Sequence, residues 1–76
     1  MADPVPSHRP HLGRVTSFDA RRGLGRVTDV DGAEFGFHAT ALADGTRSVE
    51  PGTAVAFVVA AGHRGLYEAR AVVSLG

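Results

Sequence analysis

The sequence contains no cysteine, no tryptophan and no lysine. Without cysteine the chain can form neither a disulfide framework nor a thiolate nucleophile. All eight basic residues are arginines, and eight acidic residues balance them, so the formal net charge is zero. Strong non-specific nucleic-acid binding depends on a basic surface that neutralises phosphates, and the charge balance argues against it.

Long apolar segments are also absent. No run approaches the ~20 residues that a membrane-spanning helix needs, and the N-terminus has no apolar stretch of the signal-peptide type. We therefore expect a cytoplasmic protein with no membrane partner. The length of 76 residues indicates one domain, of modest stability because so short a chain buries only about 60% of the surface it exposes when unfolded.

Residues 1–11 contain three prolines and few apolar side chains. Because proline restricts φ and lacks a backbone N–H, this composition predicts a flexible tail, followed by one domain over residues 12–76. His8 and His11 have the i, i+3 spacing of two metal ligands, but that spacing brings side chains together only on a helix, and Pro10 opposes a helix. We therefore predict solvated histidines, with no metal and no cofactor.

A tight hairpin is the clearest pattern in the chain. The β-prone run 24–30 is followed by Asp31-Gly32, a dipeptide that favours a two-residue type I′ turn because both residues tolerate positive φ. Residues 34–38 then return as the second strand. The hairpin is the element around which we expect the rest of the chain to fold.

Alternation assigns the side chains of this hairpin to two faces. Phe35 and Phe37 share one face, which we expect to be the core, with Val27 beside them on the partner strand. The opposite, outer face then carries Leu24, Arg26, Gly36 and His38.

Three further strands complete the predicted fold, at residues 12–19, 53–61 and 66–75, where β-branched and aromatic residues recur. Plain alternation places Phe18 on the face opposite Val15, which is the outer face. Residues 39–42 fit a single helical turn. Five short strands separated by glycine-bearing turns are typical of a small all-β barrel, which leaves no open sheet edge.

Several short motifs follow one another in a fixed order between residues 13 and 75. They are Gly13-Arg14-Val15 with Phe18-Asp19, Arg22-Gly23-x-Gly25, His38-x-Thr40-Ala41-Leu42, Glu50-x-Gly52 before Val55 and Phe57, Gly62-x-Arg64-Gly65, and Ala69 near Val72. In these motifs the chain resembles the cold-shock domain, a five-stranded antiparallel barrel of the oligonucleotide-binding (OB) fold. The resemblance covers the chain from residue 13 onward.

The resemblance implies binding of single-stranded RNA or DNA. In the family, outward aromatic residues stack on unpaired bases and basic residues follow the phosphates. Five positions that are aromatic in the family hold other residues here: Ser17, Leu24, Arg26, Gly36 and Ala39. The guanidinium of Arg26 can itself stack on a base or pair with a phosphate. The predicted nucleic-acid-binding residues are therefore Phe18, Arg22, Arg26, His38 and Arg64.

An ordinary structural or solvent-exposed role for these residues remains open beside the nucleic-acid-binding role. Phe18 fits either the edge of the core or a stacking surface. Arg26, His38 and Arg64 fit either ligand contact or ordinary solvated side chains. Each lost stacking platform removes roughly 1–3 kcal/mol per base, and each ~1.4 kcal/mol is a factor of ten in affinity.

We therefore expect weak single-strand binding. The alternative is a protein-interaction or structural barrel that has lost nucleic-acid binding. Catalysis has little support, because no serine or histidine sits in a triad motif. The glycines of Gly23-x-Gly25 also lack the following helix that a phosphate-cradling motif requires. We predict that the protein is not an enzyme.

Overall fold

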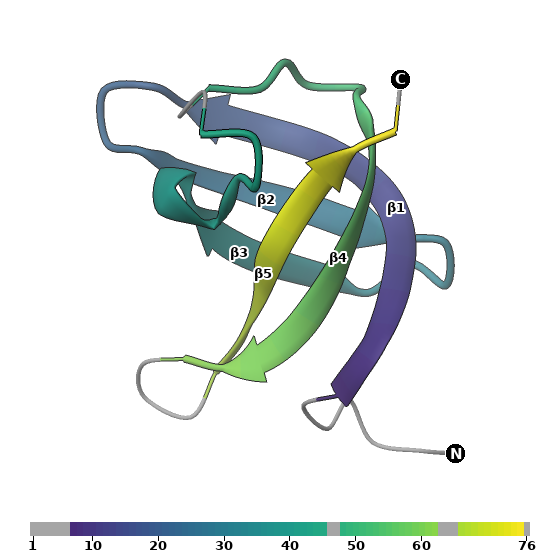
Figure 1. The fold of residues 1–76 in the computed structure, drawn as a ribbon. Helices are drawn as coiled ribbons and strands as arrows, with labels where there is room; N and C mark the ends of the chain where they lie inside the picture. Colours follow the sequence, from purple (N-terminus) through teal and green to yellow (C-terminus); the bar gives the residue numbers. More distant parts are fainter. Residues whose placement is uncertain (1–6, 46–47, 63–65, 76) are drawn as a thin grey trace.

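The computed structural model of the chain describes residues 7–45, 48–62 and 66–75. Its strands close into a barrel in the order β1-β2-β3-β5-β4 (Figure 1). The elements are β1 (Ser7–Asp19), β2 (Leu24–Asp29), β3 (Glu34–His38), the 3-10 turn η1 (Ala39–Ala41), β4 (Ala54–Ala61) and β5 (Tyr67–Ser74). The predicted all-β five-stranded barrel is confirmed, and so is the helical turn after the hairpin.

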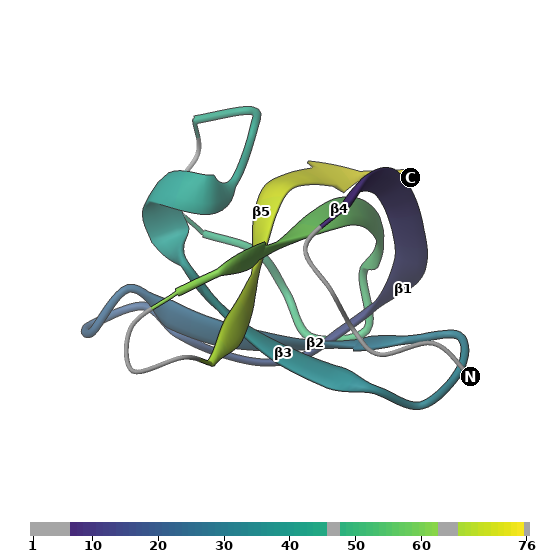
Figure 2. The same ribbon diagram turned by 90° about the horizontal axis from the view of Figure 1, so that it is seen from below.

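The strand pairs are antiparallel except where the barrel closes. There β3 pairs with β5 in parallel, through the single partner pair Gly36 and Glu68. The predicted antiparallel arrangement therefore fails at this one contact. Figure 2 shows the β2–β3 hairpin as one layer, with β4 and β5 crossing above it. The described residues include no helix with the length and hydropathy of a membrane span.

The core lies between these two layers and follows the predicted alternation in the hairpin. Val27, Phe35 and Phe37 are all buried. They pack with inward side chains from every strand; the complete set is Val15, Val27, Phe35, Phe37, Leu42, Val55, Phe57, Val59, Ala69 and Val72. Full burial of a side chain of this kind is worth about 1.5–3 kcal/mol, so this cluster is the main source of stability.

β1 begins at Ser7, five residues before the predicted start of the first strand. Residues 7–11 therefore belong to the barrel and not to a tail. Pro10 lies where the register between β1 and β4 shifts, so its missing N–H interrupts no regular ladder. His11 is paired with Phe57 and stacks on its ring, with centroids 5.5 Å apart and an interplanar angle of 16°.

A bulge in β1 turns Phe18 toward the core. The register with β2 shifts between Val15 and Ser17, which places Phe18 opposite Gly25. Plain alternation assigned Phe18 to the outer face, and this was wrong because a bulge adds one residue and resets the alternation. The Phe18 ring packs on Phe37 instead, with centroids 6.0 Å apart.

Gly25 makes this packing possible. A Cβ at Gly25 would lie 2.6 Å from Cε1 of Phe37 and 2.9 Å from Cδ1 of Phe18. Both distances are too short for any real side chain. Glycine at this position therefore lets the two aromatic rings approach the backbone of β2.

The hairpin connection differs from the predicted type I′ turn. Gly32 has a positive φ of 92°, but Asp31 does not have the positive φ that a type I′ turn requires. The connection spans residues 30–33 and is held by Asp29. Its Oδ1 accepts the backbone N–H groups of Asp31 at 2.9 Å and Ala33 at 3.0 Å. A side-chain cap thus takes the place of the predicted tight turn.

A second bulge lies in β5. The register with β4 shifts between Ala56 and Val58, and Ala71 has a φ of 51°. This left-handed conformation turns Val72 into the core. The carbonyl of Val72 accepts the backbone N–H of Ala43 at 2.8 Å, which ties the segment after η1 to the barrel.

Candidate functional site

A groove of about 800 Å³ is lined by residues of β1, β2 and β3 and by residues 66–68 at the start of β5. Four of the five predicted binding residues line it: Phe18, Arg22, Arg26 and His38. The fifth, Arg64, lies outside the described residues. The groove therefore brings together side chains from two strands, one turn and the end of the hairpin.

The middle of this groove is a row of three register partners. Ser17 on β1 pairs with Arg26 on β2, which pairs with Gly36 on β3. The next pair along the hairpin is Leu24 with His38. Leu24, Arg26 and His38 are exposed and Gly36 is half-buried, so the predicted outer face of the hairpin is confirmed.

The row contains a hollow at Gly36. A Cβ there would meet nothing closer than the carbonyl oxygen of Gly25, at 3.8 Å. Neither Ser17 nor Gly36 offers a ring, so the centre of the outer face lacks an aromatic ring on which a base could stack. A Cβ at Gly36 would therefore fit without moving the backbone.

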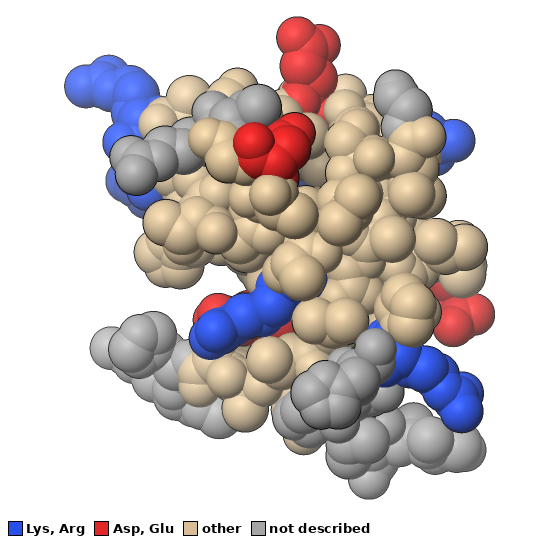
Figure 3. All heavy atoms as spheres, in the orientation of Figure 1, with Lys and Arg blue, Asp and Glu red and all other residues tan. Residues whose placement is uncertain are grey.

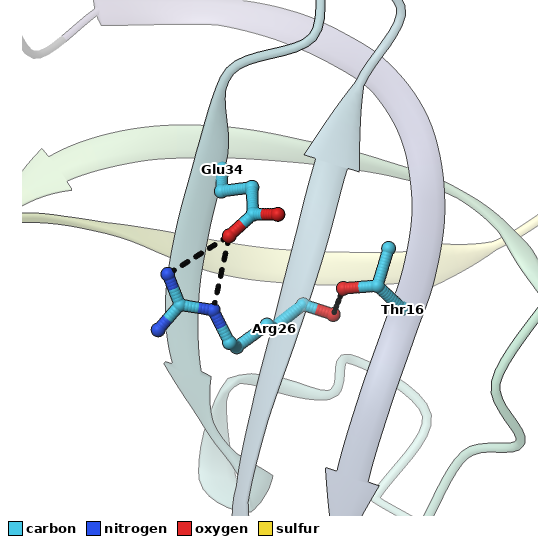
Figure 4. Close-up of polar contacts among 3 residues, drawn as sticks. All are labelled: Thr16, Arg26 and Glu34. Carbon is cyan, nitrogen blue, oxygen red and sulfur yellow. Dashed lines mark hydrogen bonds and ion pairs between the residues drawn. The ribbon is translucent and has the colours of Figure 1, made fainter.

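Arg26 is paired across the hairpin with Glu34, as Figure 4 shows. Its Nε and Nη2 donate to Oε1 of Glu34 at 3.3 and 3.0 Å. Its own carbonyl accepts the hydroxyl of Thr16 at 3.2 Å. Both partners of the ion pair are more than half exposed, and exposed pairs are worth only about 0–1 kcal/mol. Arg26 can therefore turn to another anion at small cost.

Phe18 both packs against the core and lines the groove. The ring is half-buried and packs against the core cluster, and its remaining surface lines the groove. Of the two interpretations of Phe18, the geometry supports a residue at the edge of the core. Only a partial stacking surface is left for a ligand.

Arg22 stands in the turn between β1 and β2. Its side chain is 76% exposed, with Nε 3.9 Å from Oδ2 of Asp19. Asp19 shapes this turn, because its Oδ1 accepts the backbone N–H groups of Arg21 at 3.0 Å and Arg22 at 3.2 Å. The backbone of Arg22 is thus held in place while its side chain extends into solvent. In this position the guanidinium is accessible to a phosphate.

Sequence reasoning missed the contribution of β5 to this groove. Leu66, Tyr67 and Glu68 line it, although they lie about 30 residues after the hairpin. They reach it through the parallel contact between Gly36 and Glu68. No local pattern signals this contact, because it depends on how the barrel closes.

The charge of the groove does not favour phosphates. Its charged lining residues are two arginines and three carboxylates: Arg22, Arg26, Asp19, Glu34 and Glu68. The remaining lining includes apolar and aromatic side chains such as Leu24, Leu66 and Tyr67. Among the described residues no three metal-ligating side chains gather in one place. The arrangement suits contact with flat or apolar groups better than phosphate capture.

The fold has a counterpart among solved structures. The structure of Drosophila Unr cold-shock domains 4–6 matches 90% of this chain with a TM-score of 0.73 and 23% sequence identity. This chain spans 27% of the length of that structure. No family model matches the sequence, and no curated protein matches it. The chain thus has the barrel fold of the cold-shock domain, an OB-type fold, as the sequence motifs predicted.

Proposed function

We propose that the chain is a divergent cold-shock-type module that binds single-stranded RNA or DNA weakly, without enzymatic activity, in the cytoplasm. The observation that carries this proposal is the shared groove. Phe18, Arg22, Arg26 and His38 come from separate segments and line one groove on a barrel with the cold-shock fold. The cold-shock fold and these aromatic and basic side chains both favour nucleic acid as the ligand.

Each residue has a role in the proposal. His38 and the exposed edge of Phe18 contact bases, because flat rings stack on the π-face of any base. Arg26 leaves Glu34 to stack on a base or meet a phosphate. Arg22 contacts a phosphate, and Arg64, outside the described residues, is proposed to do the same.

The expected affinity is low. The row formed by Ser17, Arg26 and Gly36 has no aromatic ring, and stacking is worth about 1–3 kcal/mol per base. Several missing platforms therefore cost several powers of ten in affinity. We expect a Kd above about 10 μM for a single-stranded heptamer at ~0.1 M salt, an order-of-magnitude value from the lost stacking.

Fluorescence anisotropy with labelled RNA and DNA heptamers tests the proposal. Arg26→Ala and His38→Ala should each weaken binding at least threefold. Arg14→Ala is the matched control, because it removes the same charge from an exposed arginine outside the groove and should leave the affinity unchanged. A sub-micromolar Kd would contradict the proposed weakness, and absence of binding at millimolar protein would refute the function.

The second candidate is a protein-binding groove. It is favoured by the charge count, because three carboxylates and two arginines in one groove repel a phosphate backbone more than a peptide. If neither RNA nor DNA binds in the titration, this candidate replaces the first.

A further inference from the structure

Two aromatic rings of the groove, Tyr67 and His38, are not paired with another ring. Neither of them stacks on an aromatic side chain in the described part of the chain, and both line the groove. The rings that do pair with one another are those of His11, Phe18, Phe35, Phe37 and Phe57. The groove therefore contains two rings whose π-faces are not covered by a second ring.

The ring of Tyr67 is held in place by the core. Tyr67 is the first residue of β5, it is half-buried, and it packs against the core cluster while it also lines the groove. Its hydroxyl makes no hydrogen bond within the described part of the chain. A side chain that is already ordered loses little rotamer entropy when a ligand binds to it. The packed ring is thus a preformed surface for a flat ligand.

The strand register places the two rings on either side of the hollow at Gly36. β3 and β5 run parallel at this point, with Gly36 opposite Glu68. Tyr67 comes one residue before Glu68, whereas His38 comes two residues after Gly36, so the two rings lie in opposite directions along the strands from this pair. No side chain covers the backbone at Gly36. A bound strand can therefore cross Gly36 between His38 and Tyr67.

The chemistry of β5 at the groove favours a base over a phosphate. Leu66 is 70% exposed, and Glu68 holds Nε of Arg70 at 3.0 Å. On the face drawn in Figure 3, blue and red spheres of the described residues are interspersed and form no continuous basic stripe. Stacking on a π-face, unlike phosphate capture, does not depend on such a stripe. The part of β5 that lines the groove therefore suits a flat, uncharged group.

We propose that an unpaired base of the bound strand stacks on Tyr67, so that the strand crosses from the β2–β3 hairpin onto β5. The inference rests on the proposed function, single-strand binding in the groove. It adds to that function a base contact that neither the alternation of the strands nor the family resemblance assigned. Tyr67 then supplies part of the stacking surface that Ser17 and Gly36 lack.

Nuclear magnetic resonance of the tyrosine ring tests the contact directly. Tyr67 is the single tyrosine of the chain, so its ring protons are identified in a sample with isotope-labelled tyrosine. Unlabelled RNA and DNA heptamers are added to the parent protein. We expect the ring protons to shift upfield, to saturate at the concentration that saturates the anisotropy titration, and to show nuclear Overhauser effects to base protons.

Substitutions at Tyr67 test what the contact contributes. Tyr67→Leu keeps an apolar side chain but removes the ring, and it should raise the Kd at least about fivefold, equivalent to about 1 kcal/mol. Tyr67→Phe keeps the ring and should stay within about twofold of the parent. Val49→Ala is the matched control, because Val49 packs against the same core cluster but does not line the groove. Its Kd should equal that of the parent.

The outcomes separate this inference from the proposed function. Binding by anisotropy without a shift or Overhauser effect at the Tyr67 ring overturns the inference and leaves the function standing. A folded Tyr67→Leu variant that binds like the parent does the same, as does a Val49→Ala variant that loses as much affinity. Absence of binding in the parent refutes both. Urea unfolding shows whether each variant is folded, and if Tyr67→Leu is not, the ring signals of the parent decide.

Discussion

The carboxylate of Asp29, at the end of β2, links this strand to the hairpin connection and to β1. Asp29 is the buried charged residue among the described residues, at 8% exposure. One oxygen caps the hairpin connection, and the other lies 3.4 Å from Nδ1 of His11 in β1. A buried carboxylate is tolerated when its oxygens have partners, and here each oxygen faces a partner. The residue therefore fixes the turn and the first half of β1 together.

Asp29→Ala should lower the free energy of unfolding by about 2–3 kcal/mol. Hydrogen bonds to a charged group contribute about 1.5–3 kcal/mol each, and the variant leaves the N–H groups of Asp31 and Ala33 without their acceptor. Urea unfolding followed by circular dichroism measures the change. Asp31→Ala, in the same connection but exposed, should stay within about 0.5 kcal/mol of the parent. Equal effects of the two substitutions would show that Asp29 does not act as the cap.

Ala71 is the described non-glycine residue with a positive φ, 51°. A side chain in the left-handed region costs roughly 1–2 kcal/mol, and glycine removes that cost while losing some conformational entropy on folding. We expect Ala71→Gly to raise the free energy of unfolding by about 0.5–1 kcal/mol, as measured by urea unfolding. Ala60→Gly in β4, where φ is not positive, should lower it by a similar amount. A loss of stability in both variants would contradict the strain at Ala71.

The β2–β3 hairpin shows which features of an element the sequence predicts. Alternation was sufficient for Val27, Phe35 and Phe37, because regular strands place every second side chain in the core. It failed for Phe18, because the bulge in β1 arises from pairing with β2 and leaves no local signal. Composition failed for residues 7–11, because the prolines predicted a tail and pairing with β4 produces a strand.

The same distinction applies to the candidate site. The exposed positions of the hairpin and the motif positions Arg22 and His38 were predictable from alternation and from the resemblance. The ion pair between Arg26 and Glu34 was not, because it depends on side-chain rotamers across two strands. The place of Tyr67 in the groove was not predictable either, because it depends on the pairing of β5 with β3 that closes the barrel.

Replacing the missing aromatic surface should restore binding if the barrel itself is intact. The variant carries Ser17→Trp, Leu24→Phe, Arg26→Phe and Gly36→Phe, at outward positions that line the groove. A Cβ at Gly36 meets no atom closer than 3.8 Å, so the substitution there begins without a backbone clash. We leave Ala39 unchanged here, because it belongs to η1 and does not line the groove. We expect oligonucleotide affinity to rise at least ~100-fold, about 2.7 kcal/mol, in anisotropy titrations.

Arg14→Phe controls for the exchange of an exposed arginine for an aromatic ring outside the groove, and it should not raise the affinity. Folding of both variants is checked by circular dichroism and amide spectra. If the folded four-fold variant binds no better than the parent, the backbone of the groove has diverged as well. The protein-binding alternative should then be preferred.

The charge balance of the whole molecule predicts a shallow salt dependence of nucleic-acid binding. Each phosphate contact to a single strand contributes about −0.7 to the slope of log K against log salt. The described groove offers Arg22 and Arg26, and Arg64 is proposed in addition, so we expect a slope between about −0.7 and −2. Anisotropy titrations between about 50 and 200 mM NaCl measure it, and affinity should fall about 3- to 16-fold across that range.

Arg22→Ala should reduce the magnitude of this slope by about 0.7, the contribution of one phosphate, whereas Arg14→Ala, outside the groove, should leave it unchanged. A slope steeper than about −3.5 would require more than five phosphate contacts. Two arginines beside three carboxylates cannot supply five contacts, so such a slope would mean that nucleic acid binds at a surface other than this groove.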